Sequence, residues 1–454
     1  MTAREVAVIG LGSSGLASTR LLRRQGHDVY VSDAGQGAAL EERAAVARSL
    51  GATVELGRHD LERIRQAARV IASPGVPPDA EPLVVARSHG VPIASEVELG
   101  LSALPNARVI AITGTNGKTT VTALVEHLLR ALGRDAAAVG NIGTPVCEVA
   151  LRDAPPGWLA LEISSFQLHD TPSLQPTVGV LTNLSPDHLD RYPSVEAYYA
   201  DKALLFQHDR PGAHWVTNAD DSASQRMCAE LAGQVSTFSI AGRLGDAFLD
   251  RAHRMLVVRD APLLERDRLP LLGGHNVANA LAATLAVMVA DPAHESDEAR
   301  ARLAEALTTF RPPAHRLEVV GEFDGITWIN DSKATNVASA RVALEAMSRP
   351  TILLLGGRHK GEPYSSLLPL ITQHCQRVLV YGEASDEIMG DLGGRGAPVE
   401  RVLGDFGAVM RRARAVAEPG WAVLLSPACS SYDMFNNYQE RGAAFARAAR
   451  GDAP

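Results

Sequence analysis

Short apolar runs of strand length alternate with longer amphipathic segments of helix length along almost the whole chain. Near its start, apolar runs lie at 6–9, 28–31 and 70–72, and amphipathic segments lie between them at 16–25 and 38–50. A strand–helix–strand order of this kind predicts parallel sheets with helices on both faces. The sequence therefore predicts an α/β fold.

The alternation is interrupted twice, and both interruptions indicate domain boundaries. It pauses around 95–105, and again at the consecutive prolines Pro312 and Pro313, which stop a helix and suit a linker. A chain of 454 residues has room for roughly three domains at about 150 residues each. We therefore predict domains at 1–100, 101–311 and 312–454. The polar, irregular segment 243–267 fits hairpins or loop and is left unassigned.

Strands and helices are also predicted beyond the first interruption. The strands are 108–113, 158–163, 177–181, 326–329, 351–355, 377–381 and 422–425, and the helices are 119–132, 194–206 and 277–290.

Composition narrows the class of protein. Apolar residues make up 46% and charged residues 21%, as in a soluble globular protein. The net charge of −8 leaves no basic excess for broad nucleic-acid binding, although local clusters can still bind an anionic substrate.

The four cysteines are widely spaced, which predicts reduced thiols rather than disulfides or a zinc site. With no signal peptide, and an apolar stretch at 277–290 too short for a bilayer, a cytoplasmic protein without a membrane anchor is expected.

The first chemical motif is a glycine-rich turn. Gly10, Gly12 and Gly15 fit G-x-G-x-x-G directly after a predicted strand, and Asp33 ends the next strand. Such a turn lets the backbone approach a diphosphate, which the following helix N-terminus favours. Taken alone, the motif leaves three possibilities open: a dinucleotide enzyme, another diphosphate ligand, or small residues needed only for packing.

The second motif is a phosphate loop at 112–120, between a strand and a long helix. Backbone amides in such a loop surround phosphates, while the lysine (Lys118) neutralises their charge and the threonine (Thr119) hydroxyl reaches Mg²⁺. Gly114 and Gly117 are three positions apart, whereas the general pattern places its glycines five apart. The order of strand, glycine turn, Gly-Lys-Thr and helix still predicts a nucleotide-phosphate site.

Two polar segments are predicted to lie beside the phosphate loop. Glu162 ends one strand and 183–190 follows another, so both belong at the same sheet edge. Glu162 suits Mg²⁺, which usually combines one or two carboxylates with phosphates and water. For His188, a ligand and a solvated or capping group remain equal alternatives. Lys202, in the predicted helix 194–206, indicates nothing by itself.

The last third of the chain carries four polar clusters, each after a strand or the linker. They are 315–316, 330–336, 358–361 and 426–431. Together they predict one ligand-facing edge.

These motifs, in this order, resemble the Mur ligase family over essentially the whole chain. The matching segments are TGTNGKTT (113–120), LEISSFQL (161–168), NLSPDHLDRY (183–192), GGHNVANALAA (273–283), HR (315–316) and NDSKATN (330–336). Members are cytoplasmic, ATP-dependent amide ligases that activate a carboxylate as an acyl phosphate, which an amino acid amine then attacks. The resemblance implies a Rossmann-like UDP-binding domain, a central P-loop ATPase-type domain with a parallel sheet, and a C-terminal Rossmann-like domain that binds the amino acid.

Within the family, three segments are most similar to the member that adds D-glutamate to UDP-N-acetylmuramoyl-L-alanine, which forms the second residue of the peptidoglycan stem peptide. They are Ser73-Pro74-Gly75, GGRHKGEPY (356–364) and LLSPACSSYDMFNNYQERGAAF (424–445). Asn436 departs from a lysine found in some relatives, which puts a charge contact there in doubt.

The resemblance also implies roles for individual residues. ATP would contact Gly114, Thr115, Asn116, Gly117, Lys118, Thr119, Thr120, Asn276, Asn279, His315, Arg316 and Asp331. The UDP-substrate would contact Ser14, Asn141, Ser164, Gln167 and His188, and D-glutamate would contact Lys333, Thr335, Lys360, Ser431 and Tyr438. Two Mg²⁺ ions would be held by Thr119, Glu162, His188 and a carbamylated Lys202, so that the catalytic set is Lys118, Glu162, His188 and Lys202. A monomer that binds neither nucleic acid nor membrane is expected.

Three rival interpretations account for less of the sequence. An NAD-dependent dehydrogenase explains the glycine turn and Asp33 but not the phosphate loop. A ligase for another step of the same pathway shares most motifs, and a folate polyglutamylating ligase would lack the UDP-binding segment at 1–95. A non-catalytic nucleotide sensor is disfavoured because the metal and phosphate residues are all present.

Overall fold

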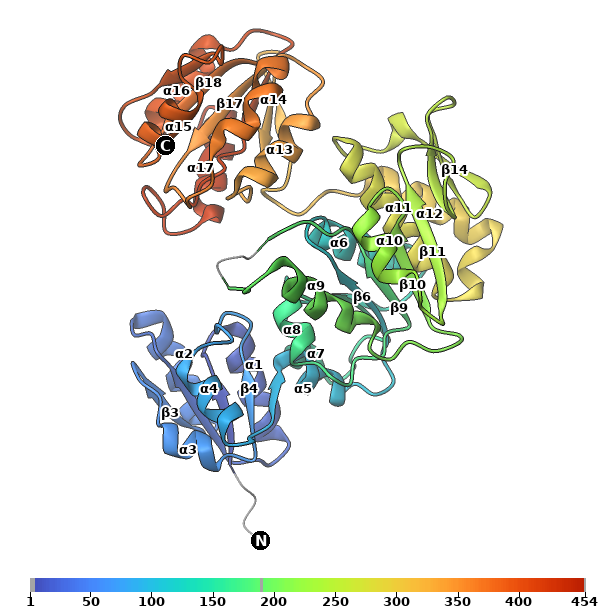
Figure 1. Cartoon of the computed structure of the whole chain (residues 1–454), viewed down its shortest axis with the longest axis vertical. Helices are drawn as coiled ribbons and strands as arrows, with labels where there is room; N and C mark the ends of the chain where they lie inside the picture. The colour runs from blue at the N-terminus through green and yellow to red at the C-terminus, as the bar shows by residue number, and fades with distance from the viewer. Residues whose placement is uncertain (1–4, 188–190, 453–454) are drawn as a thin grey trace. The chain divides into compact units, whose positions relative to one another are not determined.

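The computed structural model describes residues 5–187 and 191–452 and divides into two compact units (Figure 1). The first unit comprises Met1–Leu269 and Ala278–Phe310, and the second comprises Pro270–Val277 and Arg311–Pro454. Three separate sheets form the framework, two in the first unit and one in the second. Each unit is described by itself.

The first sheet is parallel throughout, with the strand order β3-β2-β1-β4-β5. Its strands are β1 (Val6–Ile9), β2 (Val29–Asp33), β3 (Thr53–Leu56), β4 (Arg69–Ala72) and β5 (Ile93–Ser95). Its helices are α1 (Ser13–Arg24), α2 (Ala38–Ser49), α3 (Leu61–Gln66) and α4 (Glu81–Ser88). The order reverses between β1 and β4, and in such sheets ligands bind at that switch point, outside the carboxyl ends of the strands.

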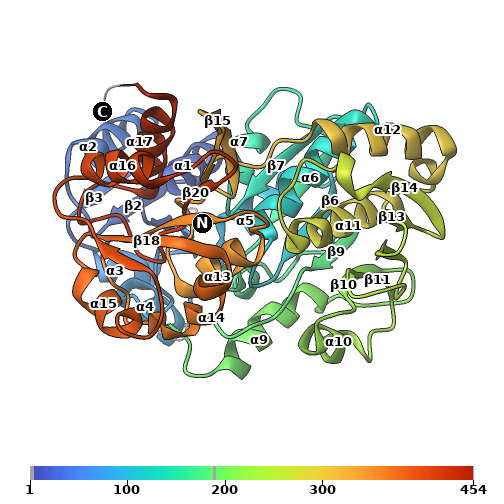
Figure 2. The same cartoon turned by 90° about the horizontal axis from the view of Figure 1, so that it is seen from above.

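The second sheet has nine strands in the order β14-β13-β12-β11-β10-β9-β6-β8-β7, and Figure 2 shows β13 and β14 at the end away from β7. Its parallel strands are β6 (Arg108–Thr113), β7 (Ala136–Gly140), β8 (Trp158–Glu162), β9 (Val178–Leu181), β10 (His214–Asn218), β11 (Gln234–Ser239) and β12 (Ala247–Asp250). The accompanying helices are α5 (Glu96–Ser102), α6 (Lys118–Ala131), α7 (Val146–Ala150), α8 (Ser165–His169), α9 (Val195–Ala203), α10 (Ser222–Cys228), α11 (Gly274–Val289) and α12 (Asp297–Thr309).

The segment that the sequence left unassigned extends this second sheet as antiparallel strands. β12 pairs with β13 (Met255–Val258), which pairs with β14 (Ala261–Glu265). The turn between the last two uses Arg259 and Asp260, both with positive φ (53° and 58°). Glycine and asparagine usually mark such a turn, so an Arg-Asp pair gave no hairpin signal.

The second unit holds a six-stranded sheet in the order β15-β16-β20-β17-β18-β19, parallel except for the antiparallel edge strand β15. The strands are β15 (Glu318–Phe323), β16 (Ile326–Asn330), β17 (Thr351–Gly356), β18 (Cys375–Tyr381), β19 (Val399–Arg401) and β20 (Ala422–Leu425). The helices are α13 (Val337–Glu345), α14 (Leu368–His374), α15 (Ser385–Leu392), α16 (Phe406–Val416) and α17 (Tyr438–Arg450). Separate apolar clusters lie on the two faces of this sheet, as expected for strands buried on both sides.

The predicted α/β class is confirmed. The four cysteines are free and buried. Within the described ranges, none of the helices combines the length and the apolar character needed to cross a bilayer.

Candidate active site

The phosphate loop joins β6 to α6 and depends on both of its glycines. Gly114 has φ +143° and Gly117 has φ +85°, which side chains rarely tolerate. A Cβ atom would lie 2.0 Å from the Thr182 hydroxyl oxygen at Gly114, and 2.5 Å from the Asn279 side-chain oxygen at Gly117. The two glycines are therefore required here although their spacing departs from the general pattern.

The segment after β9 holds the loop in shape. The Asn116 N–H donates to the Asn183 side-chain oxygen (2.9 Å), and the Thr182 hydroxyl donates to the Asn116 carbonyl (2.6 Å). The Thr115 N–H donates to the Asn183 carbonyl (2.9 Å), and the Ser185 N–H donates to the Thr115 hydroxyl (3.0 Å). The predicted juxtaposition of 183–190 with the phosphate loop is thus found for its described part, whereas His188 lies outside the described residues.

Two lysines converge on the same loop carbonyl. Lys118 Nζ donates to the carbonyls of Gly114 (2.8 Å) and Thr115 (2.9 Å), and Lys202 Nζ also donates to that of Gly114 (2.8 Å). Lys202 is only 1% exposed. Burial, followed by the nearby charge of Lys118, holds the pKa of Lys202 well below its usual value, against the opposing pull of nearby carboxylates. A buried lysine of this kind has access to its neutral, nucleophilic amine form.

Glu162, at the end of β8, presents an unsatisfied carboxylate oxygen. The side chain is 2% exposed, and its Oε1 accepts a hydrogen bond from Asn141 Nδ2 at 2.8 Å. Its Oε2 is buried and has no hydrogen-bond partner among the described residues. A buried carboxylate oxygen without a partner is costly, so this position fits a cation. The described part of the chain contains no group of three or more His, Cys, Asp or Glu suited to a metal. One carboxylate oxygen of this kind nevertheless suits Mg²⁺, which takes its other ligands from phosphates and water.

Other predicted site residues of the first unit lie at the N-termini of α6 and α8. Thr119 and Thr120 are buried in the first turn of α6. Ser164 and Gln167 form a capping box at the start of α8, in which the Ser164 hydroxyl donates to Gln167 Oε1 (2.9 Å) and accepts from the Gln167 N–H (3.3 Å). Gln167 Nε2 is buried without a hydrogen-bond partner in the described ranges, which leaves it a donor for a ligand.

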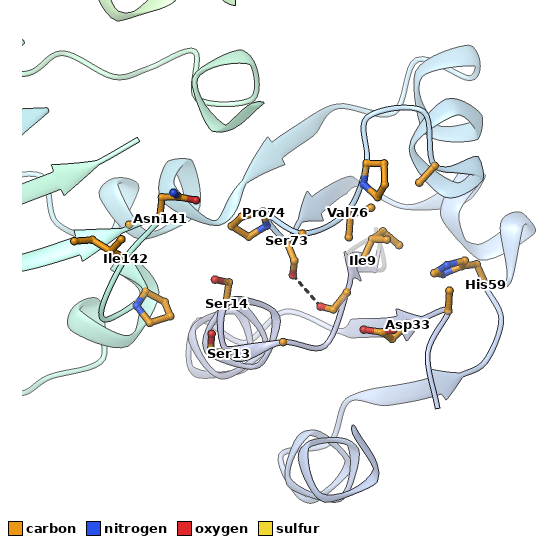
Figure 3. A pocket seen from close by; sticks show the side chains of 18 of the residues that line it. Ile9, Ser13, Ser14, Asp33, His59, Ser73, Pro74, Val76, Asn141 and Ile142 are labelled. Atoms are coloured by element: carbon orange, nitrogen blue, oxygen red, sulfur yellow. Dashed lines mark hydrogen bonds between the residues drawn. The ribbon is translucent and has the colours of Figure 1, made fainter. Parts of the chain in front are cut away.

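A pocket of about 560 Å³ opens at the switch point of the first sheet (Figure 3). Gly10 and Gly12 line it between β1 and α1, Ser14 lies in the first turn of α1, and Asn141 and Ile142 come from the segment after β7. Both carboxylate oxygens of Asp33 accept hydrogen bonds from the backbone, one from the Leu11 N–H (2.7 Å) and one from the Gly35 N–H (2.8 Å). The acidic residue therefore stabilises the turn itself.

The three glycines of the turn have different roles. A Cβ at Gly15 would lie 1.8 Å from the Gly10 carbonyl oxygen, and one at Gly10, where φ is +90°, would lie 2.9 Å from Ser73 Cβ. Gly10 and Gly15 are thus required by the fold. Gly12 has nothing within 4 Å of its Cβ position, and it lines the pocket. Only Gly12 keeps its space clear for a ligand.

In the second unit, residues that were predicted to contact ATP lie near the end of β16. Asp331 is buried and accepts from the Ser426 hydroxyl (2.9 Å) and the Leu317 N–H (3.2 Å), and burial raises its pKa to about 7. His315 has φ 65°, and its Nδ1 accepts from Asn330 Nδ2 at 2.9 Å. Arg316 follows it directly. Asn276, also in this unit, is buried and donates to the Leu272 carbonyl (2.8 Å).

Four of the residues predicted to contact D-glutamate form two pairs in the same unit. Lys360 Nζ donates to the Thr335 hydroxyl (3.2 Å), and Lys333 Nζ lies 5.5 Å from the centre of the Tyr438 ring. Ser431 is buried. The structure therefore brings Thr335 to Lys360 and Lys333 to Tyr438.

Sequence reasoning missed Arg441, which connects two of these segments. The side chain is 1% exposed and donates to the Ser332 hydroxyl (3.0 Å) and carbonyl (2.8 Å) and to the Cys429 carbonyl (3.1 Å). It thereby joins the segment of Lys333 to the segment of Ser431. Its helix also carries exposed arginines, so no local pattern distinguished it.

The comparisons with known proteins agree with this architecture. Three family profiles match: Mur ligase MurD-like, N-terminal domain, over 4–95; Mur ligase middle domain over 112–287; and Mur ligase, glutamate ligase domain, over 315–429. The chain is 39% identical to a UDP-N-acetylmuramoylalanine--D-glutamate ligase of Acidobacterium capsulatum, covering 97% of this chain and 95% of the relative. It is also 39% identical to the ligase of the same name from Anaeromyxobacter dehalogenans, covering 98% and 97%.

Solved structures show the same fold. MurF ligase from Thermotoga maritima, in complex with ADP, matches with a TM-score of 0.63 at 17% identity, over 99% of both chains. UDP-N-acetylmuramate-alanine ligase MurC from the same organism matches with a TM-score of 0.61 at 22% identity, also over 99% of both. With the phosphate loop, the family profiles and the relatives that match over nearly the whole chain identify this protein as an ATP-dependent ligase. The chain belongs to the Mur ligase family.

Proposed function

We propose that the chain joins D-glutamate to UDP-N-acetylmuramoyl-L-alanine, using ATP and releasing ADP and phosphate. The relatives of this name, similar over nearly their full length, support the substrate assignment. The structural observation that carries it is Asn141, which lines the glycine-turn pocket and also donates a hydrogen bond to Glu162. One residue thus connects a pocket suited to a diphosphate with the carboxylate beside the phosphate loop.

The reaction must bring two anions together, because the γ-phosphate of ATP and the substrate carboxylate repel one another. Lys118, in the phosphate loop, supplies positive charge to the transferring phosphoryl group. The carboxylate oxygen attacks phosphorus, ADP leaves, and an acyl phosphate forms. The amine of D-glutamate then attacks the acyl carbon, phosphate leaves and an amide forms. We assign the domain at 1–100 to the UDP-substrate, the domain at 101–311 to ATP and the domain at 312–454 to D-glutamate. Closure of the last domain would keep water from the acyl phosphate.

We also propose two Mg²⁺ ions, which would neutralise phosphate charge when bound. Thr119 and Glu162 would hold one, and His188 with a carbamylated Lys202 would hold the other. The unpaired Glu162 Oε2 supports the first position. The lowered pKa of Lys202 supports the second, since only an uncharged amine reacts with CO₂ to give a carbamate and a proton. A carbamate, unlike an ammonium, is an anionic oxygen ligand of the kind that Mg²⁺ prefers.

The remaining assignments follow the same proposal. The free, buried cysteines support a reducing compartment, and we propose a cytoplasmic monomer that acts on soluble substrates.

The direct test measures phosphate released from ATP with UDP-N-acetylmuramoyl-L-alanine and each amino acid in turn. We expect release with D-glutamate and little with L-glutamate, L-alanine or L-lysine. Turnover with another amino acid, or with UDP-N-acetylmuramate and L-alanine, would assign a different step to this chain.

Gly12→Val tests the diphosphate position. The new side chain has space in the protein but occupies the pocket, so the fold should persist while UDP-substrate binding weakens. We expect the KM for the UDP-substrate to rise at least about tenfold, as for the loss of one charged hydrogen bond, with the KM for ATP unchanged. Gly15→Ala is the contrasting variant, because its Cβ overlaps the Gly10 carbonyl and should destabilise the protein. A loss of ATP affinity in Gly12→Val would contradict the assignment.

Lys360→Ala tests the amino-acid position. Removing a cation that contacts a substrate carboxylate should raise the KM for D-glutamate by about 10- to 100-fold, the range for a charge-assisted hydrogen bond. The KM for the UDP-substrate should stay nearly constant. Arg358→Ala is the matched control, because Arg358 lies two positions away and pairs with the exposed Glu383 at 2.9 Å. Equal losses for both substrates would exclude Lys360 as a specific anchor.

A further inference from the structure

The first turn of α5 links the two segments that carry the proposed UDP-substrate contacts. This turn follows β5, where the chain leaves the first sheet and enters the second. α5 packs against α1 and α7 (Figure 1). α7 continues the segment that carries Asn141, and α8 carries Gln167 and is capped by Ser164.

Glu96 makes the connection to α7 through a buried carboxylate. The side chain is 1% exposed, and its Oε1 accepts a hydrogen bond from the Cys147 N–H at 2.6 Å. The Cys147 thiol donates to the Glu96 carbonyl (3.3 Å) and lies 3.9 Å from the Ser18 hydroxyl on α1. Glu96 Oε2 is buried without a hydrogen-bond partner among the described residues. The carboxylate thus joins α5 to α7, and the Cys147 thiol extends the connection to α1.

Ser95 makes the connection to α8. Its N–H donates to the Asp170 carbonyl (2.7 Å), and its hydroxyl lies 2.7 Å from that of Thr171. The Thr171 hydroxyl donates in turn to the Gln167 carbonyl (2.5 Å). The same turn of α5 therefore holds both α7 and α8.

The spacing between α5 and α7 leaves little freedom. A Cβ atom at Gly100 would lie 2.6 Å from Val146 Cγ1 and 2.8 Å from the Cys147 backbone nitrogen. Because close packing transmits displacements, a change at Cys147 moves the preceding segment 140–145 as well. That segment lines the glycine-turn pocket and contains Asn141.

We propose that Glu96 is a positioning residue, which fixes segment 140–147 so that Asn141 aligns the UDP-substrate pocket with Glu162. This inference rests on the proposed function. Glu96 itself does not line the pocket; it acts through the Cys147 N–H at one end of the segment, while Asn141 acts on Glu162 Oε1 at the other.

Protonation provides a readout that simple packing would not affect. Burial raises the pKa of Glu96 to about 7, partly offset by the hydrogen bond from Cys147. Cys147 on α7 is the titratable group in contact with it, and burial raises the pKa of that thiol well above its usual value, so the thiol stays protonated. Ser18 on α1 does not titrate in this range. The ionised carboxylate, which accepts the Cys147 N–H more strongly, accumulates as the pH rises through about 7.

The experiment compares Glu96→Ala and Glu96→Gln with Glu148→Gln, a control on α7 that removes only the partly exposed ion pair with Arg20. We expect Glu96→Ala to raise the KM for UDP-N-acetylmuramoyl-L-alanine about tenfold and to lower kcat, with the KM for D-glutamate unchanged. Glu96→Gln keeps the acceptor but cannot ionise. In the unmodified protein and in Glu148→Gln, we expect kcat/KM for the UDP-substrate to rise as the pH increases through about 7. In Glu96→Gln, this increase should be absent.

Two outcomes overturn the inference: retention of that rise in Glu96→Gln, or equal changes in both KM values in Glu96→Ala. If Glu96→Ala does not fold, the Glu96→Gln profile decides alone. Calorimetric titration of each protein with the UDP-substrate separates this inference from the proposed function. An unmodified protein that binds the UDP-substrate but does not use D-glutamate contradicts only the function, and the Glu96 variants then test the inference through the dissociation constant.

Discussion

Lys202→Ala is expected to reduce ligation by at least about a hundredfold, as when a group that stabilises developing charge at the reaction centre is lost. The physical reason is that a carbamate on Lys202 would place negative charge between two cations beside the phosphate loop. The amine lies 2.8 Å from the Gly114 carbonyl and is almost fully buried, so its loss removes a group inside the site. Steady-state phosphate release and amide formation, measured with all three substrates saturating, give the effect.

Rescue separates chemistry from packing. Acetate can occupy the space of the missing carbamate and supply an anionic oxygen, so added acetate should partly restore Lys202→Ala activity. Lys202→Met, which fills more of the cavity without a carboxylate, should remain inactive. Carbon-13 NMR of the unmodified protein under labelled CO₂ should show a carbamate signal that is absent from both variants. Near-normal activity in Lys202→Ala would exclude the proposal.

The residue composition makes that spectrum simple to interpret. The chain contains 40 arginines but only four lysines, Lys118, Lys202, Lys333 and Lys360. In surface ion pairs such as Arg48–Glu41, Arg358–Glu383 and Arg412–Glu400, arginine supplies the cation. Arginine cannot be deprotonated in proteins, and its guanidinium is larger than a compact ammonium. Lys118 and Lys202 lie at the phosphate loop of the first unit, and Lys333 and Lys360 belong to the proposed D-glutamate contacts of the second. At Lys202 the proposed carbamate requires an amine, which arginine cannot supply.

The α/β class and the central strands of the three sheets could be predicted from the sequence, because these strands are buried on both faces. Continuous apolar runs between helical segments predicted β1, β6 and β20 closely. The strands that were not predicted are β3, β5, β7, β10 to β15 and β19. They include both edge strands of each sheet: β3 and β5, β7 and β14, and β15 and β19. β15 is an edge strand with alternating exposure, and the Arg-Asp turn before β14 carries no glycine or asparagine. Edge strands depend on their neighbours more than on their own sequence pattern.

In the candidate site, too, some features could be predicted from the sequence and others could not. Residues within one loop, such as Gly114 and Lys118, were predictable because the phosphate loop is a local structure. The hydrogen bonds that hold it come from Asn183, 67 positions from Asn116, and those from Arg441 reach back 109 positions to Ser332. The sequence predicted that the segment 183–190 lies beside the loop, but not the individual hydrogen bonds, and it gave no indication of the Arg441 contacts. Glu96 was missed for the same reason, since a glutamate at the start of a helix normally interacts with the helix dipole at the surface.

Glu162→Gln is expected to lower kcat at least about a hundredfold while leaving the KM for D-glutamate nearly unchanged, because a lost charge at the metal-phosphate site acts mainly in the transition state. The amide preserves the shape of the side chain and can still accept from Asn141, so the UDP-substrate pocket should keep its form. What changes is the buried Oε2, which becomes an uncharged NH₂ that repels a cation. The Mg²⁺ concentration needed for half-maximal activity should therefore rise, and high Mg²⁺ should recover part of the rate. Glu126→Gln, which removes a carboxylate paired with Arg130 on the surface of α6, controls for the loss of one negative charge near the loop. An unchanged Mg²⁺ requirement in Glu162→Gln would show that this carboxylate does not hold the metal.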